Sequence, residues 1–340
     1  MTTTHPPRPL DPRHGIHEPT SGTPARTPGS VRRTTTVDML RPDGLDGPLV
    51  LMGRGRDLST GPAPANVLVA AEASCRAVVD FAGGRTLREI ATTPERPGLE
   101  RLRGSRVSSG FRGRLDETDP NLHAEHDLLY LLLDDLPVTT LVSGHAFMAG
   151  RDQSHRPDPM AGRPAFAADL CAGFATGATI MNEIERTGSP PVVTGPAAPS
   201  LADQDDPMAW HAIGPLPPHG MRRTRRIDVR PGEPATVDAI FRDSYVRPDG
   251  LETIIHEYTL TAEIDDGTVR ACEATARVLP WTECPAAVAS AGRLAGIPLR
   301  GLRRHVRKTF TGTSTCTHLN DMLRALEDVA ALLELATPLP

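Results

Sequence analysis

A cysteine and a histidine stand two residues apart near the C-terminus, within the small-residue stretch Thr311-Gly-Thr-Ser-Thr-Cys-Thr-His-Leu-Asn320. Glycine, serine and threonine favour a turn here, and the apolar spacing that follows predicts a helix from about Asn320 to Leu335. A thiol and an imidazole at the start of a helix can both point into one site. Cys316 and His318 are therefore the best candidates in the sequence for a chemical site.

The composition of the chain excludes several classes of protein. A formal net charge of -5 over 340 residues gives no general attraction to nucleic acid or to an anionic membrane. The longest apolar run, Leu128 to Leu133, is far shorter than the roughly 20 residues of a membrane-spanning helix. Five cysteines do not indicate a disulfide framework, and the N-terminus lacks the apolar core of a signal peptide. We expect a cytoplasmic protein with small-molecule partners, no nucleic acid and no membrane.

The chain repeats its own pattern. Val31-Arg-Arg-Thr-Thr-Thr-Val-Asp38 returns as Met221-Arg-Arg-Thr-Arg-Arg-Ile-Asp228, and the strand, glycine turn and strand of Arg76 to Leu87 return in Thr259 to Val269. Two copies of one domain, fused head to tail, explain this repetition. The predicted organisation is a disordered tail over residues 1–30, a first copy over 31–149, a Pro- and Gly-rich linker with one helix (165–186) over 150–218, and a second copy over 219–336.

The order of elements within the second copy defines the fold class. The predicted strands are Thr224–Val229, Thr236–Tyr245, Glu252–Glu263 and Val269–Val278, and the predicted helices are Pro285–Leu294, Leu299–Phe310 and Asn320–Leu335. Strands that precede helices in this way are typical of an α+β domain, in which helices cover one face of an antiparallel sheet. The whole chain is then a tandem pseudo-dimer of two such domains.

Four parts of the second copy resemble the bacterial family known as domain of unknown function 2889. They are the run Arg222–Asp228, the strand with His256, Cys284 ahead of Leu294-Ala-Gly296, and Thr315-Cys-Thr-His-Leu319. Both halves look like members of this family, over about 31 to 145 and 219 to 336. The family name implies a shared fold and no activity.

The order of motifs is also similar to that of the NifU-type scaffold domains of iron-sulphur assembly. In both, a strand, a glycine turn and a second strand precede a cysteine that leads a small-residue helix, and a loop that carries His and Cys precedes the final helix. Here His256-Glu257 replaces the first cysteine motif, and the final pair is inverted and spaced as Cys316 and His318. The resemblance would bring together His256, Cys284, Cys316 and His318, an ordinary set of ligands for zinc or iron.

The first copy lacks most of this set. The loop that carries Cys284 is missing, Ala124 stands for Cys316, and the position that faces His256 falls near Ala73. Of the four candidates only the counterpart of His318 remains, as His126. Loss from one copy alone is typical of a functional site and not of packing.

These observations favour a metal-dependent enzyme of the hydrolase or lyase type, acting on a small organic, for example an acyl-coenzyme A-derived, metabolite. Glu257 is expected as the nearby acid or base, and Arg303 and Arg304 as candidates to hold the phosphates of a cofactor. Three alternatives use the same residues. Cys316 can act as a nucleophile with His318 as its base, the cysteines can serve a non-enzymatic metal or sulphur scaffold, or the copies can enclose a small ligand.

Overall fold

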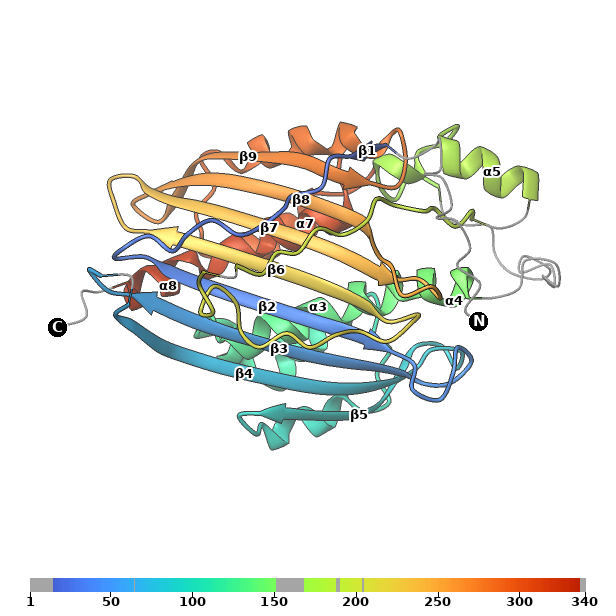
Figure 1. Cartoon of the computed structure of the whole chain (residues 1–340), viewed down its shortest axis with the longest axis horizontal. Coiled ribbons are helices and arrows are strands. Elements are labelled where there is room, and N and C mark those ends of the chain that lie inside the picture. The colour runs from blue at the N-terminus through green and yellow to red at the C-terminus, as the bar shows by residue number, and fades with distance from the viewer. Residues whose placement is uncertain (1–14, 64, 151–167, 188–189, 204, 337–340) are drawn as a thin grey trace.

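A nine-stranded antiparallel sheet runs through both halves of the computed structural model, which describes residues 15–63, 65–150, 168–187, 190–203 and 205–336 (Figure 1). The strand order is β1-β9-β8-β7-β6-β2-β3-β4-β5. The strands are β1 (Ile16–His17), β2 (Val31–Leu40), β3 (Leu49–Thr60), β4 (Val67–Asp80), β5 (Thr86–Thr93), β6 (Met221–Arg230), β7 (Ala235–Val246), β8 (Glu252–Asp265) and β9 (Thr268–Leu279). The predicted α+β class is confirmed.

The helices follow each group of four strands. The α-helices are α1 (Phe111–Thr118), α2 (Pro120–Ala124), α3 (Leu128–Val142), α4 (Gly144–Ala149), α5 (Thr179–Thr187), α6 (Leu302–Thr309), α7 (Thr317–Ala325) and α8 (Val329–Leu335). Short 3₁₀ helices are η1 (Pro97–Leu102), η3 (Ala172–Phe174), η4 (Cys284–Leu294) and η5 (Leu326–Asp328). None of the helices in the described ranges is long and apolar enough to cross a membrane.

The two halves begin with the same order of elements, four strands and then a 3₁₀ helix, and their first three strands have equal lengths. β2, β3 and β4 contain 10, 12 and 14 residues, and so do β6, β7 and β8. A β-bulge follows Asp57 in the pairing of β3 with β4, and another follows Asp243 in the pairing of β7 with β8. The correspondence therefore extends to local irregularities of the backbone.

The halves meet where β2 pairs antiparallel with β6. Thr35 pairs with Arg225, its own counterpart in the repeated sequence, so a local two-fold axis passes through this pair. On either side of the axis lie two matching ion pairs, Arg32 with Asp228 at 2.6 Å and Arg222 with Asp38 at 2.5 Å. Both strands are buried on both faces, which explains why their arginines need internal partners.

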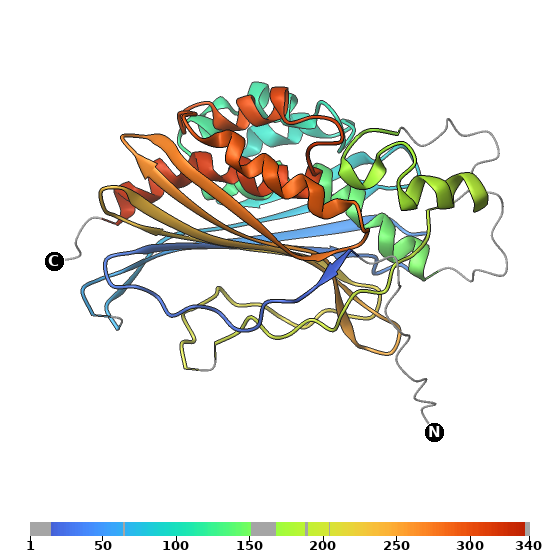
Figure 2. The same ribbon diagram turned by 90° about the horizontal axis from the view of Figure 1, so that it is seen from above.

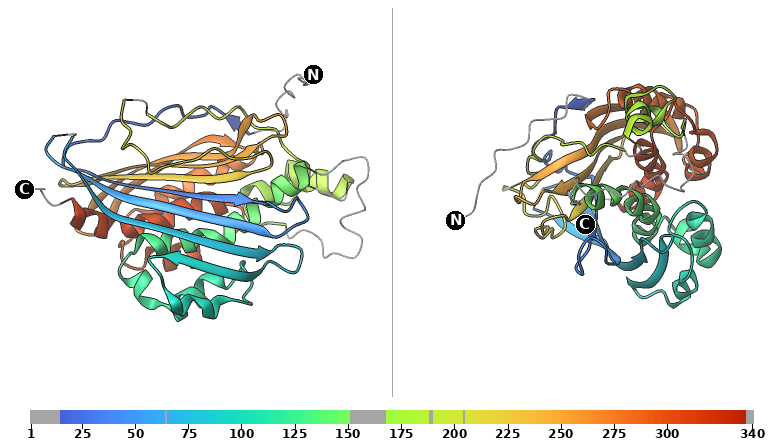
Figure 3. Two further views of the ribbon diagram at one scale, coloured as in Figure 1. Left: turned by 60° about the horizontal axis from the view of Figure 1, so that its bottom comes forward. Right: turned by 90° about the vertical axis from the view of Figure 1, so that its right-hand side faces the viewer.

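The two faces of the sheet have different covers. Figure 2 shows the helices gathered on one face, and Figure 3 shows that this face is concave and holds the helices of both halves side by side. The other face is crossed by the extended segments 15–30, 190–203 and 205–216 (Figure 2). The N-terminal segment is tied down by the pairing of β1 with β9 and by the ion pair of Arg26 with Asp206. The expected disordered tail over 1–30 is thus wrong for residues 15–30, while residues 1–14 lie outside the described residues.

Each half has a hydrophobic core beneath its helices, and each core includes side chains from the other half. α3 is buried on all sides and is capped by Asp127, whose side chain accepts a hydrogen bond from the Leu129 amide. Its Leu131 belongs to the core of the C-terminal half, whereas Met221 and Tyr245 belong to the core of the N-terminal half. The helices of each half therefore pack across the central pair of strands.

Candidate metal centre

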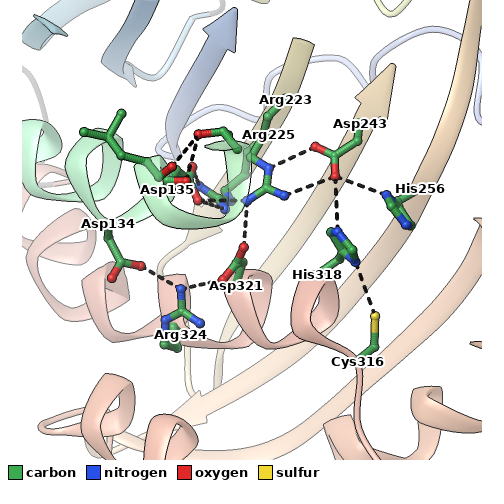
Figure 4. Close-up of polar contacts among 12 residues, drawn as sticks. Asp134, Asp135, Arg223, Arg225, Asp243, His256, Cys316, His318, Asp321 and Arg324 are labelled. Atoms are coloured by element: carbon green, nitrogen blue, oxygen red, sulfur yellow. Dashed lines mark hydrogen bonds and ion pairs between the residues drawn. The ribbon is translucent and has the colours of Figure 1, made fainter. Parts of the chain in front are cut away.

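The site begins with a carboxylate and an imidazole that face each other across two strands. Asp243 on β7 pairs with His256 on β8, and the bulge follows directly, where Ser244 pairs with Ile254. His256 Nδ1 lies 3.3 Å from Asp243 Oδ2 (Figure 4). Bulges are common beside functional sites because they re-aim side chains. Both side chains are buried on the face of the sheet that holds the helices.

The second imidazole comes from the first turn of α7. The loop before this helix turns at Gly312, which has a φ of +73°, and the Ala172 amide donates a hydrogen bond to the Thr315 carbonyl at 2.9 Å. The helix then begins at Thr317, so that the ring of His318 stacks on that of His256 with centroids 3.6 Å apart. His318 Nε2 lies 3.9 Å from Asp243 Oδ2. Sequence analysis paired these two histidines, and the structure brings them together.

Two ring nitrogens in this cluster are buried and make no hydrogen bond within the described part of the chain. They are His256 Nδ1 and His318 Nε2, the same atoms that face the Asp243 carboxylate. The ligand atoms of the three residues all lie within 4.8 Å of one another. Two ligands on one zinc or iron ion, at bond lengths of about 2.0–2.2 Å, are separated by roughly 3–3.5 Å. The cluster therefore has the donors and nearly the spacing of a metal site.

An arginine holds the carboxylate in place. Arg223 on β6 bonds both oxygens of Asp243, at 2.9 and 3.1 Å, and also bonds Asp321 of α7 at 2.6 Å. Burial alone would raise the pKa of Asp243, but the Arg223 guanidinium and the neighbouring histidines hold it well below its usual range. Burial and the charge of His256 lower the pKa of His318 to about 3. An ionised carboxylate and a neutral imidazole are the forms that bind a metal.

Cys316 lies on the far side of His318. Its Sγ is 3.8 Å from Nδ1, the ring nitrogen that points away from Asp243. Cys316 is therefore placed as a partner of His318 and not beside the other two donors. Burial and the neighbouring Cys171 raise the pKa of the Cys316 thiol to about 11. A nucleophilic cysteine needs a lowered pKa, so the environment opposes that expected role.

Cys284 opens the 3₁₀ helix η4 and packs into the hydrophobic core of the C-terminal half. Its Sγ is so close to Gly173 that a Cβ there would lie 2.7 Å away. Burial, with Cys316 and Cys171 nearby, raises the pKa of its thiol well above the usual value. The structure does not bring Cys284 into the group of Asp243, His256 and His318, so the expected four-ligand set is not assembled.

Glu257 lies on the opposite face of the sheet from His256. Neighbours along a strand point to opposite sides, and the carboxylate of Glu257 accepts hydrogen bonds from Arg242 and, at 2.6 Å, from the Thr20 amide. These partners belong to the face crossed by the N-terminal segment. The expectation that Glu257 serves as an acid or base beside the histidines is therefore corrected.

The two arginines expected to hold phosphates have different surroundings. Arg303 is 1% exposed, bonds Asp328 at 2.6 and 2.9 Å, and lies over the ring of Tyr130 at 5.1 Å. Its positive charge is thus already paired with Asp328 inside the protein and is not available to a phosphate. Arg304 is exposed on α6 and remains available for a phosphate.

The N-terminal half offers an internal comparison for the site. Arg33 bonds Asp57 at 2.7 Å, just as Arg223 bonds Asp243, and the strand register places Ala71 opposite Asp57, where His256 stands in the other half. The counterpart of His318 is His126, whose Nδ1 lies 3.3 Å from Asp328 Oδ1. The arginine–aspartate pair is therefore present in both halves, whereas the pair of stacked histidines is present in one.

Further aromatic groups stand beside the cluster. His145 on α4 packs edge-on against Tyr245 with centroids 4.9 Å apart, and the Tyr245 hydroxyl lies 3.0 Å from His219 Nδ1. Burial and the charge of His256 lower the pKa of His145 to about 4. Helix α4 thus closes the cluster on the side of β7.

A hollow of about 770 Å³, lined by Trp210 and other residues of 198–216, lies on the opposite face of the sheet.

Asp243 is the member of this cluster that was not predicted from the sequence. It stands in the strand segment Phe241-Arg-Asp-Ser-Tyr245, where alternation places it on the same face as two buried aromatic residues. An acid at such a position needs a partner. That signal is present in the sequence, but the partner, Arg223, is visible only from the strand register.

Comparison with known proteins gives one match. Residues 221–332 match the family described as "Protein of unknown function (DUF2889)", a segment that contains Asp243, His256, Cys316 and His318. The match covers about a third of the chain and lies in the C-terminal half. It supports neither a second copy over 31–149 nor a likeness to NifU-type scaffolds. No curated protein and no solved structure matches the chain.

Proposed function

We propose that Asp243, His256 and His318 hold a single metal ion, and that the protein is a metal-dependent enzyme acting on a small organic substrate. The observation that carries this proposal is the pair of buried imidazole nitrogens that face one carboxylate, at 3.3 Å for His256 and 3.9 Å for His318, without hydrogen bonds of good geometry. Buried polar atoms are usually satisfied, and a metal ion would satisfy both. Two histidines and a carboxylate suit zinc and iron.

The number of protein ligands favours catalysis over a structural role. Structural zinc sites are closed by four protein ligands, whereas catalytic sites use three and keep a position open. A metal held here would polarise a carbonyl or activate water, the chemistry of a hydrolase or lyase. The side chains of His256 and His318 are 10% and 16% exposed, although the two nitrogens that would bind the metal are buried.

The neighbours of the three ligands would position them. With Nε2 of His318 on the metal, Nδ1 carries the proton and donates to Cys316 Sγ, which fixes the tautomer and the ring plane. Arg223 fixes the carboxylate of Asp243 through two bonds. Exposed Arg304 is the group that would suit an acyl-coenzyme A-derived substrate.

We also infer that the two halves arose by internal duplication and that only the C-terminal copy kept the site. Equal strand lengths, matching bulges and the local two-fold axis at Thr35 and Arg225 support this inference. In the N-terminal copy Asp57 retains its arginine but faces Ala71. We place the protein in the cytoplasm, with small molecules and not nucleic acid as partners.

Metal content is the test of this proposal. Elemental mass spectrometry of the purified protein, or of apoprotein reloaded with zinc or iron(II), should find close to one ion per chain. Asp243→Asn, His256→Ala and His318→Ala should lose it. Asp57→Asn and His126→Ala, the matched changes in the N-terminal half, should keep it. Wild type that takes up no metal, or controls that lose it equally, would overturn the proposal.

A positive result then justifies a search for activity. Esters, thioesters and hydroxy acids are the substrates to screen, with hydrolysis or loss of water as the reaction. Activity should require the metal and should disappear in the same three variants. A sulphur scaffold predicts instead a transferable persulphide on Cys284 or Cys316 and no turnover, an outcome that the raised pKa of both thiols disfavours.

A further inference from the structure

The candidate metal centre borders a cluster of buried charges that is already balanced. Arg223 links Asp243 to Asp321 and Asp135, and the remaining members are joined in the same way. The eight members of this charged cluster are the arginines Arg112, Arg223, Arg225 and Arg324 and the aspartates Asp134, Asp135, Asp243 and Asp321. Figure 4 labels all of them except Arg112. Four positive charges thus meet four negative charges.

The adjoining ion pairs do not change this balance. Arg33 and Arg303 pair with Asp57 and Asp328, which gives two charges of each sign. All four side chains are at most 3% exposed, so water screens them little. Asp243 therefore brings no spare negative charge to the metal, because Arg223 already neutralises it.

A divalent ion at this place would carry two uncompensated positive charges. His256 and His318 contribute neutral donor atoms, and Asp243 is the one acid among the three ligands. An uncompensated charge in a buried place is costly unless an opposite charge accompanies it. The three-ligand geometry leaves open positions on the metal, and an anion bound there would restore the balance.

We infer that the substrate coordinates this metal as a small carboxylate anion. This inference rests on the metal centre proposed above. A carboxylate suits the site because it supplies charged oxygen atoms, which zinc and iron accept. It is also planar and smaller than a phosphate, which suits a site whose two imidazole nitrogens, His256 Nδ1 and His318 Nε2, are buried. The substrate would then add to the metal the negative charge that the protein does not supply.

Cobalt(II) binding to the wild-type protein tests the inference, because the visible spectrum of cobalt reports on its ligands. Titrations would be run in a non-coordinating buffer, then with acetate, and then with acetamide, which has the same shape and no charge. After correction for the weak complex of acetate with free cobalt, acetate should lower the cobalt dissociation constant at least tenfold and change the spectrum. Acetamide should do neither.

Each other outcome has a definite meaning. If acetate has no effect, or if acetamide acts equally, the inference is overturned while the metal centre stands. If phosphate is as effective as acetate, the carboxylate class is overturned. If cobalt binds under none of these conditions, the proposed function fails and the inference fails with it.

A charge variant provides a second test with a matched control. Arg112 of α1 is the most exposed member of the charged cluster, at 17%, so its replacement should be tolerated. In Arg112→Gln the cluster has one negative charge to spare, and cobalt should bind more tightly without acetate and gain less from it. Arg114→Gln removes the same charge from the same helix outside the cluster and should behave as wild type. Equal behaviour of the two variants would contradict the inference.

Discussion

The two ring nitrogens of His318 face different partners, and this assigns different roles to His318 and to Cys316, which stands two residues before it. Nε2 faces Asp243 at 3.9 Å and Nδ1 faces Cys316 at 3.8 Å. In the proposed centre His318 is then a ligand and Cys316 its support. A support of this kind usually changes metal affinity by about 10–100-fold without abolishing binding.

Variants of His318 and of Cys316 should therefore differ in their effect on metal binding: one should abolish it and the other only weaken it. We expect His318→Ala to lose the metal and Cys316→Ala to retain it with an affinity about 10–100-fold lower. Cys284→Ala should bind as wild type, because Cys284 lies in the hydrophobic core. Metal titration of the three apoproteins measures this. Complete loss in Cys316→Ala would restore Cys316 as a direct ligand, as the sequence suggested.

Part of this site could be predicted from sequence and part could not. His256 and His318 lie together, as the likeness in the order of motifs to NifU-type scaffolds led us to expect, although no match supports that likeness. Asp243 was missed because its nearness to His256 depends on the pairing of β7 with β8. Register also corrects the counterpart of His256 in the first half, which is Ala71 and not Ala73. Strand register is a tertiary property, and the spacing of residues does not give it.

At the scale of elements, the strands were predicted better than the helices. The predicted strand Glu252–Glu263 is β8, Glu252–Asp265, because alternation and β-branched residues mark a strand directly. The predicted helix Asn320–Leu335 is instead α7, η5 and α8 in succession. At η5 the Glu327 carboxylate accepts from the Arg303 amide at 2.5 Å. A hydrogen bond between elements that are distant in the sequence does not affect the spacing of apolar residues, so this spacing does not predict it.

The predicted linker helix, 165–186, begins later than expected. The observed helix α5 is Thr179–Thr187, preceded by η3 and by Gly177 with a φ of +78°. Glycine in the left-handed region ends a regular helix. Residues 165–167 lie outside the described residues.

His123 joins elements of the two halves and gives a pH-dependent contribution to stability. Its Nδ1 lies 3.3 Å from Asp116 of α1, and its Nε2 lies 2.9 Å from Glu327 of η5. The hydrogen bonds to Asp116 and Glu327 raise the pKa of His123 to about 9 against the opposing effect of burial. In the unfolded chain a histidine titrates near 6.5.

The folded pKa is the higher one, so the charged form is favoured by folding. Its contribution is complete below about pH 6.5 and is lost as the pH rises through 9. The free energy of unfolding from urea titrations should therefore show His123→Gln to be less stable than wild type at pH 6.5, with a smaller deficit at pH 9.5. A deficit of the same size at both pH values would mean that packing on Tyr130, not charge, accounts for the loss.

At the scale of the whole molecule, the boundary between the halves contains matched buried ion pairs. Asp228 bonds Arg32 at 2.6 and 2.8 Å, and Asp38 bonds Arg222 at 2.5 and 3.0 Å. Removing one partner of such a pair leaves an unpaired buried charge and costs about 3–5 kcal/mol. Asp228→Asn and Asp38→Asn should each lower the free energy of unfolding by about that amount. The loss should be larger for Asp228→Asn, because Asp228 also pairs with buried Arg226, whereas the second arginine near Asp38 is the exposed Arg54 at 3.7 Å. Denaturant titration of both variants checks this, and a larger loss in Asp38→Asn would contradict it.

The same boundary bears on whether 31–149 and 219–336 unfold separately. Nine residue pairs join β2 to β6, and each core contains residues of the other half, among them Leu131 and Tyr245. Unfolding either half would expose the central strand of the other and leave its arginines without partners. This arrangement favours one cooperative transition.

Two matched core substitutions decide the question. Leu132 of α3 and Leu323 of α7 are fully buried in the cores of the N-terminal and C-terminal halves. Truncation of such a leucine costs about 2–5 kcal/mol. If the halves unfold together, Leu132→Ala and Leu323→Ala should each reduce hydrogen-exchange protection in β3 and in β7 by the same free energy. If each variant weakened only its own half, the shared sheet would join two independently stable domains. In the cooperative case, the first half lacks the pair of stacked histidines and still supports the second, because the second cannot bury β6 without it.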